Sequence, residues 1–261
     1  SLQHLSEFGE MRLSGQGEMH LRVALERLSG RYGVSVESAA TEVGYRESIR
    51  GKASARGRHR KQSGGHGQFG DVVLEVAPLP RGEGVRFVDR ITGGVVPRQY
   101  ISSVEAGVRD FCQRGPLGFP LVDVEVTLTD GSYHTVDSSD MAFRQAARIA
   151  MSEACPQAKP VLLEPILAVE IVIPSDAMSR ASALVSARRG QIVGYDARPG
   201  WRGWDQINAQ VPEAEMAGLI VELRSATSGV GSFSARFDHL AELAGKPADA
   251  VVAAQAMAQA R

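Results

Sequence analysis

The spacing of hydrophobic and polar positions divides the chain into three stretches with different patterns. In the first stretch, residues 1–41, leucines recur at helical spacing over residues 21–28. We predict a helix there that Gly33 ends, followed by a strand in which Val34 and Val36 alternate with polar residues. A strand that ends near Arg12, followed by a turn, would precede the helix. The resulting β-α-β piece is too small to form a good core alone.

The second stretch, residues 42–160, switches between the periods of strands and helices. Val72–Ala77 and Leu121–Leu128 have the two-residue alternation of strands, and we expect a turn over residues 129–136. Pro97 stands where a helix begins, and we expect Asp137 to be the N-cap of a second helix whose inner face is rich in alanine. The stretch is long enough to form a domain with its own core.

The third stretch, residues 161–243, has the order β-α-β-β-α-β. We expect Ser175 to cap its first helix, Gly190 to end that helix, and Pro212 to open the second one. This order predicts a ferredoxin-like sandwich, in which two helices cover one face of a four-stranded antiparallel sheet. Residues 244–261 are an alanine-rich tail with high helix propensity. The fold class is therefore α+β with several domains.

Composition is that of an ordinary globular protein. The 261 residues are 43% hydrophobic and 23% charged, with a formal net charge of −1, and this length fits about one to three domains. Because the net charge is near zero, a nucleic-acid site would have to be local. The two cysteines, Cys112 and Cys155, form no C-x-x-C pair, which disfavours a zinc site or a disulfide framework and fits the cytoplasm. No apolar run or signal-peptide pattern indicates a membrane.

Positive charge is concentrated between Tyr45 and Gly70, directly before a glycine-rich loop. Glu47 alone opposes the basic residues, which are Arg46, Arg50, Lys52, Arg56, Arg58, Arg60 and Lys61. The loop has the sequence Gly64-Gly65-His66-Gly67-Gln68-Phe69-Gly70. Guanidinium groups attract phosphate, and backbone amides without side chains let it come close. A solvated surface face is the simpler interpretation of such a charge run.

Enzymatic interpretations of the remaining motifs are weaker. The loop formally matches G-x-G-x-x-G, but a strand follows it where a dinucleotide site needs a helix. No P-loop sequence occurs, and no Cys/His cluster has the spacing of metal ligands. Ser132, His134 and Asp137 contain the residue types of a hydrolase triad, yet they lie in one short loop, whereas triad members converge from separate elements. Trp201 and Trp204 either form a contact surface or pack over their own sheet.

Seven longer motifs, in order along the chain, resemble those of elongation factor G. They are Leu13–Leu21, Gln62–Gly70, Gly93–Pro97, Asp130–His134, Val136–Phe143, Leu162–Ile166 and Arg188–Ile192. The resemblance implies that residues 1–41 are the end of domain III, 42–160 domain IV, 161–243 domain V and 244–261 a tail. Domain IV would have the fold of ribosomal protein S5 with a left-handed crossover, an exception to the usual hand.

The resemblance also implies a role on the ribosome. Two loops at the tip of domain IV would enter the decoding region and contact the tRNA and mRNA, and domain V would lean on ribosomal RNA of the large subunit. The implied contact residues are Arg58, Arg60, Lys61, Gly64, Gly65, His66, Gly67, Gln68, Tyr133, His134, Arg188 and Arg189. GTP and Mg²⁺ would bind only in a preceding domain, so we expect this region to catalyse nothing and to hold no cofactor.

Three departures from the family pattern indicate a paralog rather than the housekeeping translocase. His66 replaces the usual arginine, the turn over residues 199–205 differs, and the tail beyond Gly245 has no evident counterpart. Ribosome recycling and ribosome protection share this architecture and stay open as alternatives to translocation. A truncated domain III would leave a sheet edge uncovered, and we expect it either to dock on a second copy of the chain or to be the least stable part.

Overall fold

The computed structural model describes residues 2–5, 10–13, 15, 18–38, 42–61 and 67–259. The chain divides into two units, and strands β8 (Pro160–Pro174), β10 (Trp204–Pro212) and β11 (Ser232–Leu243) each run from one unit into the other. One unit contains residues 44–168, 210–214 and 235–261, and the other contains 1–43, 169–209 and 215–234. None of the described helices is both long and apolar enough to cross a membrane.

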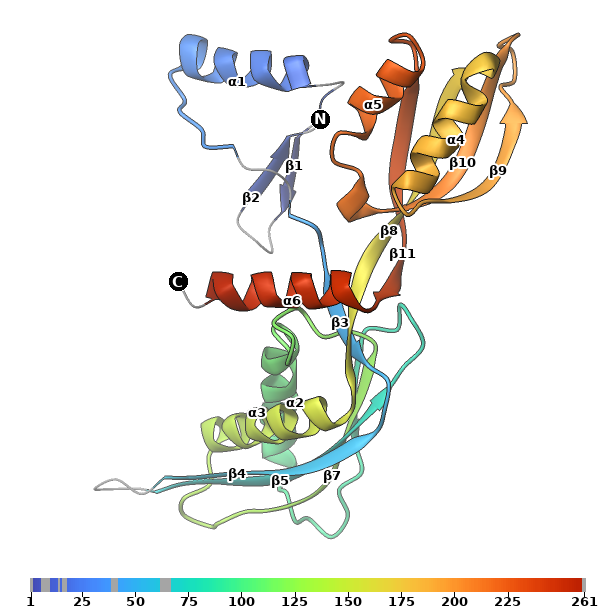
Figure 1. Ribbon diagram of the computed structural model, residues 1–261. Helices are drawn as coiled ribbons and strands as arrows, with labels where there is room; N and C mark the ends of the chain where they lie inside the picture. The colour runs from blue at the N-terminus through green and yellow to red at the C-terminus, as the bar shows by residue number, and fades with distance from the viewer. Residues whose placement is uncertain are drawn as a thin grey trace. The chain divides into compact units, whose positions relative to one another are not determined.

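The larger unit is built on a four-stranded sheet with two helices on one face (Figure 1). The strands are β4 (Ala53–Lys61), β5 (Gln68–Pro78), β6 (Val85–Asp89) and β7 (Val124–Ser132), in the order β4-β5-β7-β6. The β4-β5 and β5-β7 pairs are antiparallel, whereas β6 and β7 are parallel. The parallel pair is joined through helix α2 (Arg98–Cys112), which makes it a β-α-β crossover; its hand stays a prediction.

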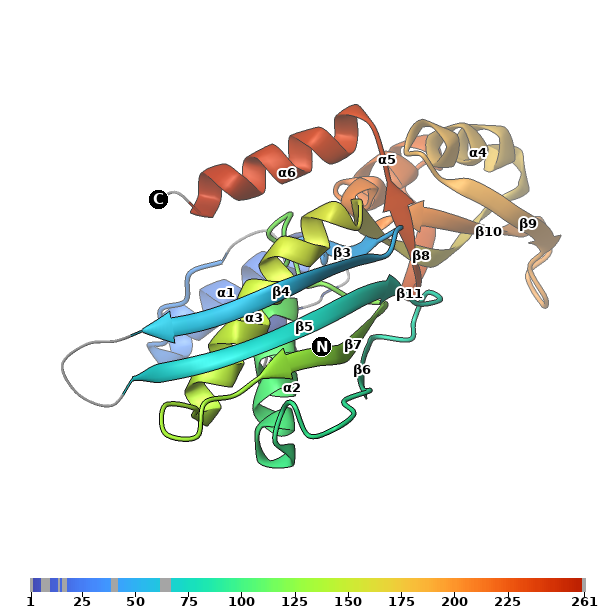
Figure 2. The same cartoon turned by 90° about the horizontal axis from the view of Figure 1, so that it is seen from below.

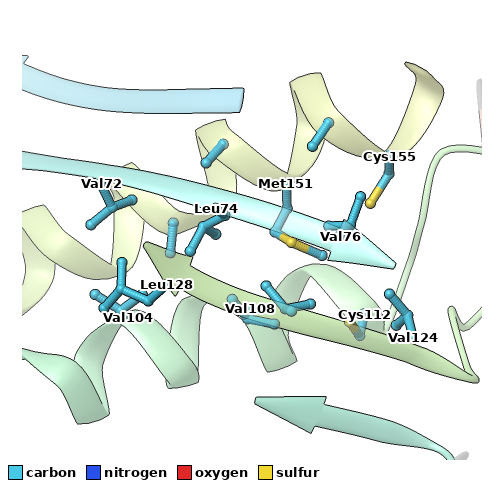
Figure 3. Packing of buried hydrophobic residues seen from close by; sticks show 14 of the residues in the cluster. Val72, Leu74, Val76, Val104, Val108, Cys112, Val124, Leu128, Met151 and Cys155 are labelled. Carbon is cyan, nitrogen blue, oxygen red and sulfur yellow. The ribbon is translucent and has the colours of Figure 1, made fainter. Parts of the chain in front are cut away.

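The core of this unit lies between the sheet and helices α2 and α3 (Asp140–Gln157). Alternate residues of β5 face the helices, because successive strand residues point to opposite faces. Figure 3 shows these side chains meeting those of the two helices; the buried set includes Val72, Leu74, Val76, Val104, Val108, Cys112, Leu128, Met151 and Cys155. The predicted alternation over Val72–Ala77 and the predicted alanine-rich inner face of α3 are confirmed here.

Two glycines let the sheet approach α3 closely. A β-carbon added to Gly57 on β4 would collide with the carbonyl oxygen of Ala146, and one added to Gly70 on β5 would collide with Ala142. The basic run was not predicted to be a strand, because its exposed side is charged and its buried side contains glycine. Close packing on α3, rather than hydrophobic alternation, therefore accounts for β4.

Strand β3 (Arg46–Ile49) and the C-terminal helix complete the larger unit. Strand β3 pairs antiparallel with the first residues of β8 (Pro160–Pro174). Helix α6 (Lys246–Gln259) packs on a second cluster of apolar side chains from β8, the loop after α2 and the residue before β3. The helix contributes Ala248, Val251 and Val252, and the side-chain amide of Gln255 donates to the carbonyl of Gly118 at 3.2 Å.

The strands of the second sheet follow the order β11-β8-β10-β9, which is the ferredoxin-like arrangement. Its remaining elements are α4 (Met178–Ala187), β9 (Gln191–Ala197), β10 (Trp204–Pro212), α5 (Leu219–Ala226) and β11 (Ser232–Leu243). Helices α4 and α5 lie on the same side of the sheet in Figure 1. The element order predicted for this stretch is thus confirmed.

The N-terminal piece differs from its prediction. Strands β1 (Leu2–Leu5) and β2 (Glu10–Leu13) form an antiparallel hairpin before helix α1 (Glu18–Tyr32). The backbone N–H groups of Gly33 and Val34 bond back to carbonyls of the last helical turns, and Gly33 has φ of +66°. The positive φ of Gly33 and these two bonds end the helix. The predicted strand at Val34 and Val36 is wrong, since the described residues 33–38 contain no strand.

Several predicted boundaries were also wrong. Helix α3 is capped by Ser139, whose hydroxyl accepts from the backbone N–H of Ala142, and not by Asp137. Ser175 makes no capping bond, because the chain enters α4 through a short 3₁₀ turn. Arg189, with φ of +56°, takes the left-handed position after α4 that was assigned to Gly190. Residues 129–132 continue β7 rather than forming a turn.

Candidate nucleic-acid interface

The far end of the β4–β5 hairpin is joined to the segment that follows β7. The backbone N–H of Gly67 donates to Asp137 Oδ1 at 3.0 Å, and the N–H of Phe69 donates to the carbonyl of Asp137 at 2.8 Å. The hydroxyl of Ser138 donates to the carbonyl of Phe69 at 3.0 Å. Asp137 therefore fastens one loop to the other instead of capping a helix.

The two predicted tip loops accordingly lie together where they are described. Gly67 and Gln68 lie beside the segment containing Tyr133 and His134, and Gln68 also contacts the ring of His59 at 2.9 Å. Gly64, Gly65 and His66, which were predicted to contact RNA, lie outside the described residues. The joint placement of the described part agrees with the prediction.

Aromatic rings and a guanidinium group gather at this end. The ring centroids of Phe69 and His134 are 6.3 Å apart, and the guanidinium of Arg58 lies 6.0 Å from the Phe69 centroid. His134 Nδ1 accepts from the backbone N–H groups of Val136 and Asp137, so its other ring nitrogen carries the proton as the neutral tautomer. The imidazole side chain is 54% exposed, which leaves that N–H available to a ligand.

Asp71 holds two of the arginines on β4 in place. Its carboxylate is fully buried and accepts two bonds of 2.7 Å from Arg56, one of 3.4 Å from Arg58 and one of 2.6 Å from the hydroxyl of Ser132. Burial alone would raise the pKa of Asp71, but the bonds from Arg56 and Ser132 and the two positive charges outweigh it and lower the pKa. The carboxylate therefore stays ionised beneath two guanidinium groups.

Asp71 and Arg56 were missing from the predicted site. A signal was present in the sequence, since an acidic residue follows the glycine loop at the start of a strand whose hairpin partner is basic. In the register of β4 with β5, Arg58 lies opposite Asp71, so the acidic and basic residues come into contact. Only a prediction of the hairpin register would have revealed it.

The hydrolase alternative does not fit this geometry. Ser132 donates to Asp71 and not to His134, so the imidazole of the expected triad does not lie on its hydroxyl. Asp137 lies 3.3 Å from His134 Nδ1, on the side of the ring that already accepts two backbone N–H groups. A triad needs the serine on one ring nitrogen and the carboxylate on the other. Ser132, His134 and Asp137 instead form hydrogen bonds that hold the loops in place.

The two arginines predicted to contact RNA after α4 are engaged with their own unit. The side chain of Arg188 is only 12% exposed, donates to backbone carbonyls before α5 and pairs with Glu222 at 2.9 Å. Arg189 pairs with Glu215 at 2.8 Å and is more exposed. Arg188 thus braces the approach to α5, and a contact of either arginine with RNA stays a prediction.

Comparison with known proteins is consistent across sequence and structure. Residues 41–159 match the family described as elongation factor G, domain IV, and residues 161–251 match the one described as elongation factor G C-terminus. The chain belongs to the elongation factor G family. Together the two matched regions of elongation factor G cover most of the chain, and they meet at the start of β8.

Relatives of the chain carry the name "Elongation factor G-like protein". The one from Synechocystis sp. is 55% identical over 92% of this chain, and the one from Thermotoga maritima is 47% identical over 88%. A crystal structure from Thermus thermophilus is similar with a TM-score of 0.86 and 39% identity over 98% of this chain. The chain spans 36% and 34% of the two named relatives and 38% of the crystallised chain.

Proposed function

We propose that this chain is the ribosome-binding C-terminal region of an elongation factor G-like translation factor. In this proposal the joined end of domain IV, formed by the β4–β5 hairpin and residues 133–138, contacts tRNA and mRNA in the decoding region. The observation that carries the proposal is the fastening of the two loops through Asp137 next to exposed aromatic and basic side chains. A hydrogen-bonded segment with an exposed ring and ring N–H suits unpaired nucleotides, which are recognised by stacking and hydrogen bonding.

The GTPase domain and the cellular location are inferred from the family. GTP and Mg²⁺ would bind in a preceding GTPase domain, and the factor would work in the cytoplasm, where ribosomes are. Within the described residues no group of three His, Cys, Asp or Glu side chains is placed to hold a metal ion. In this proposal the region contributes binding and positioning, and the chemistry belongs to the GTPase domain.

The test uses the full-length factor with His134→Ala on ribosomes carrying tRNA and mRNA. We expect slower tRNA–mRNA movement with GTP hydrolysis retained, because the change removes the ring at the tip together with the bonds that its Nδ1 accepts from Val136 and Asp137. His239→Ala is the matched control, since His239 is an exposed histidine paired with a neighbouring aspartate on β11. Equal rates for both variants would contradict the proposal.

Subunit splitting measured in the same reactions decides between translocation and recycling. A factor that separates subunits without moving tRNA and mRNA would be a recycling paralog. Relief of an antibiotic block without either activity would indicate ribosome protection. In each of these outcomes the domain IV end would still be the ribosome-contacting part.

A further inference from the structure

Three arginines of β4 share the face of the sheet that the helices leave open. Gly57 faces α3, because its added β-carbon would meet Ala146. Successive strand residues alternate between faces, so Arg56, Arg58 and Arg60 all lie on the opposite side. Figure 2 views the sheet from this side, with β4, β5 and β7 in front of α2 and α3.

The three arginines form a row along an exposed edge. Residues two apart in a strand are separated by about 6.6 Å, so the row has a regular spacing along β4. The side chains of Arg56 and Arg58 are 51% and 56% exposed even while they contact Asp71. In the part of the chain that the structure describes, Arg60 makes no ion pair, and strand β4 is an edge of its sheet.

Asp71 orients the guanidinium groups of the row but does not cancel the positive charge of the row. One buried carboxylate holds two guanidinium groups, which leaves a net positive charge on that group of three. The negative charge of Asp130 also acts on Arg56, and Arg60 adds a further positive charge. Two bonds of 2.7 Å fix the plane of the Arg56 guanidinium. A guanidinium held in a fixed plane loses little side-chain freedom when it binds phosphate.

We propose that Arg56, Arg58 and Arg60 form a track for the sugar–phosphate backbone of single-stranded RNA, which leads along β4 to the aromatic end at Phe69 and His134. The proposal rests on the proposed function and extends its contact surface from the loops to the open sheet face. Single-stranded RNA is chosen because the basic strip ends at the half-buried ring of Phe69 and the exposed ring of His134. It therefore offers both binding elements, charge for the backbone and a stacking surface for bases. The Arg58 guanidinium over the Phe69 ring connects the two.

The experiment measures binding of a short, fluorescein-labelled single-stranded RNA to the 261-residue chain by anisotropy over a series of salt concentrations. The variants are Arg58→Gln, Arg60→Gln and the double variant. Arg56 is left in place because it keeps the buried Asp71 paired, so the variants retain their fold. Arg86→Gln is the matched control, since Arg86 lies on β6 at the other edge of the same sheet and is 51% exposed.

The expected result is a smaller salt dependence as well as weaker binding. Each phosphate contact that is lost should reduce the slope of log K against log salt by about 0.7. The double variant should therefore lose about 1.4 from the slope, while Arg86→Gln should match the parent chain. Circular dichroism of each variant confirms that the sheet is intact.

Three outcomes separate the possibilities. If the double variant has the slope of Arg86→Gln while His134→Ala still weakens RNA binding, the track is wrong and the tip survives. If the parent chain binds neither the RNA probe nor ribosomes, both the RNA track and the proposed function are wrong. If a polyglutamate peptide of equal charge binds as tightly and with the same loss in the double variant, the row is a general anion surface and the RNA track is overturned.

Discussion

Glu47 is a carboxyl group that the fold keeps away from water. It lies on β3, is fully buried, and its Oε2 accepts from the backbone N–H of Leu117 at 2.6 Å. Its other carboxyl oxygen has no partner among the described residues. Burial, opposed by backbone bonds from Leu117 and Phe119, raises the pKa of Glu47 to about 8.

A raised pKa makes the contribution of Glu47 to stability depend on pH. Between its unfolded pKa of 4.5 and its folded pKa of about 8, the native state holds one proton more than the unfolded state. Stability from this group is therefore full below the lower value and falls by about 1.4 kcal/mol per pH unit across that window. We predict that Glu47→Gln flattens the decline, as measured by urea unfolding at about pH 5 and pH 8. An equal decline in parent and variant would contradict this assignment.

Gly57 is a second residue whose identity the packing dictates. We predict that Gly57→Ala destabilises the protein by about 1–3 kcal/mol, because its methyl group would have to displace the α3 backbone at Ala146. Gly194→Ala on β9 is the control, since a β-carbon there meets nothing within 4 Å. That change should be neutral or slightly stabilising. Thermal unfolding of both variants compares them, and similar melting temperatures would count against the close contact.

At the scale of elements, α6 is held by a narrow apolar strip. Val251 and Val252 pack on the cluster around Phe119 and Leu162, whereas Met257 on the same helix is 71% exposed. We predict that Val251→Asp destabilises the larger unit by about 1–3 kcal/mol, because it puts a charge against apolar side chains. Met257→Asp should change stability by no more than about 0.5 kcal/mol. Hydrogen exchange in β3 reports the loss directly, and unchanged protection there would rule out docking of α6.

Elements with one dominant signal were predictable from the sequence. The order β-α-β-β-α-β predicted for residues 161–243 is found in the structure, because the strand and helix periodicities are clear there. Strand β4 was not predictable, since its packing side depends on Gly57 and its open side is charged. At α3 the expected cap, Asp137, instead accepts the bond from Gly67, and Ser139 caps the helix.

The site was predictable in part for a similar reason. Motif resemblance pointed to the two loops, and the residues between Tyr133 and Asp137 are local in sequence. The pairing of Asp71 with Arg56 depends on a hairpin register and a buried carboxylate, which no local pattern encodes. The bracing of Arg188 likewise depends on backbone carbonyls before α5, at residues 215 and 217.

At the scale of the whole molecule, charge is distributed unevenly rather than in excess. The chain carries a net charge of −1, yet Arg56, Arg58 and Arg60 stand in a row on one open face. A protein of this kind should bind polyanions through that face alone. We predict that chemical footprinting of the chain with bound RNA protects β4 and leaves the exposed side of α3 unchanged; protection spread over both faces would contradict a local track.

The larger unit is also assembled from distant parts of the chain, because α6 begins at Lys246 and covers Phe119 and Leu162. On a translating ribosome, the apolar patch at Phe119 and Leu162 therefore emerges well before its cover is made. Since synthesis adds about 5–20 residues per second, residues 44–168 are made roughly 5–20 s before residues 235–261 are complete. Nascent chains halted at residue 245 should be cut by protease near residues 115–120 faster than finished ones. The folding of the larger unit during synthesis would thus depend on how soon helix α6 leaves the ribosome.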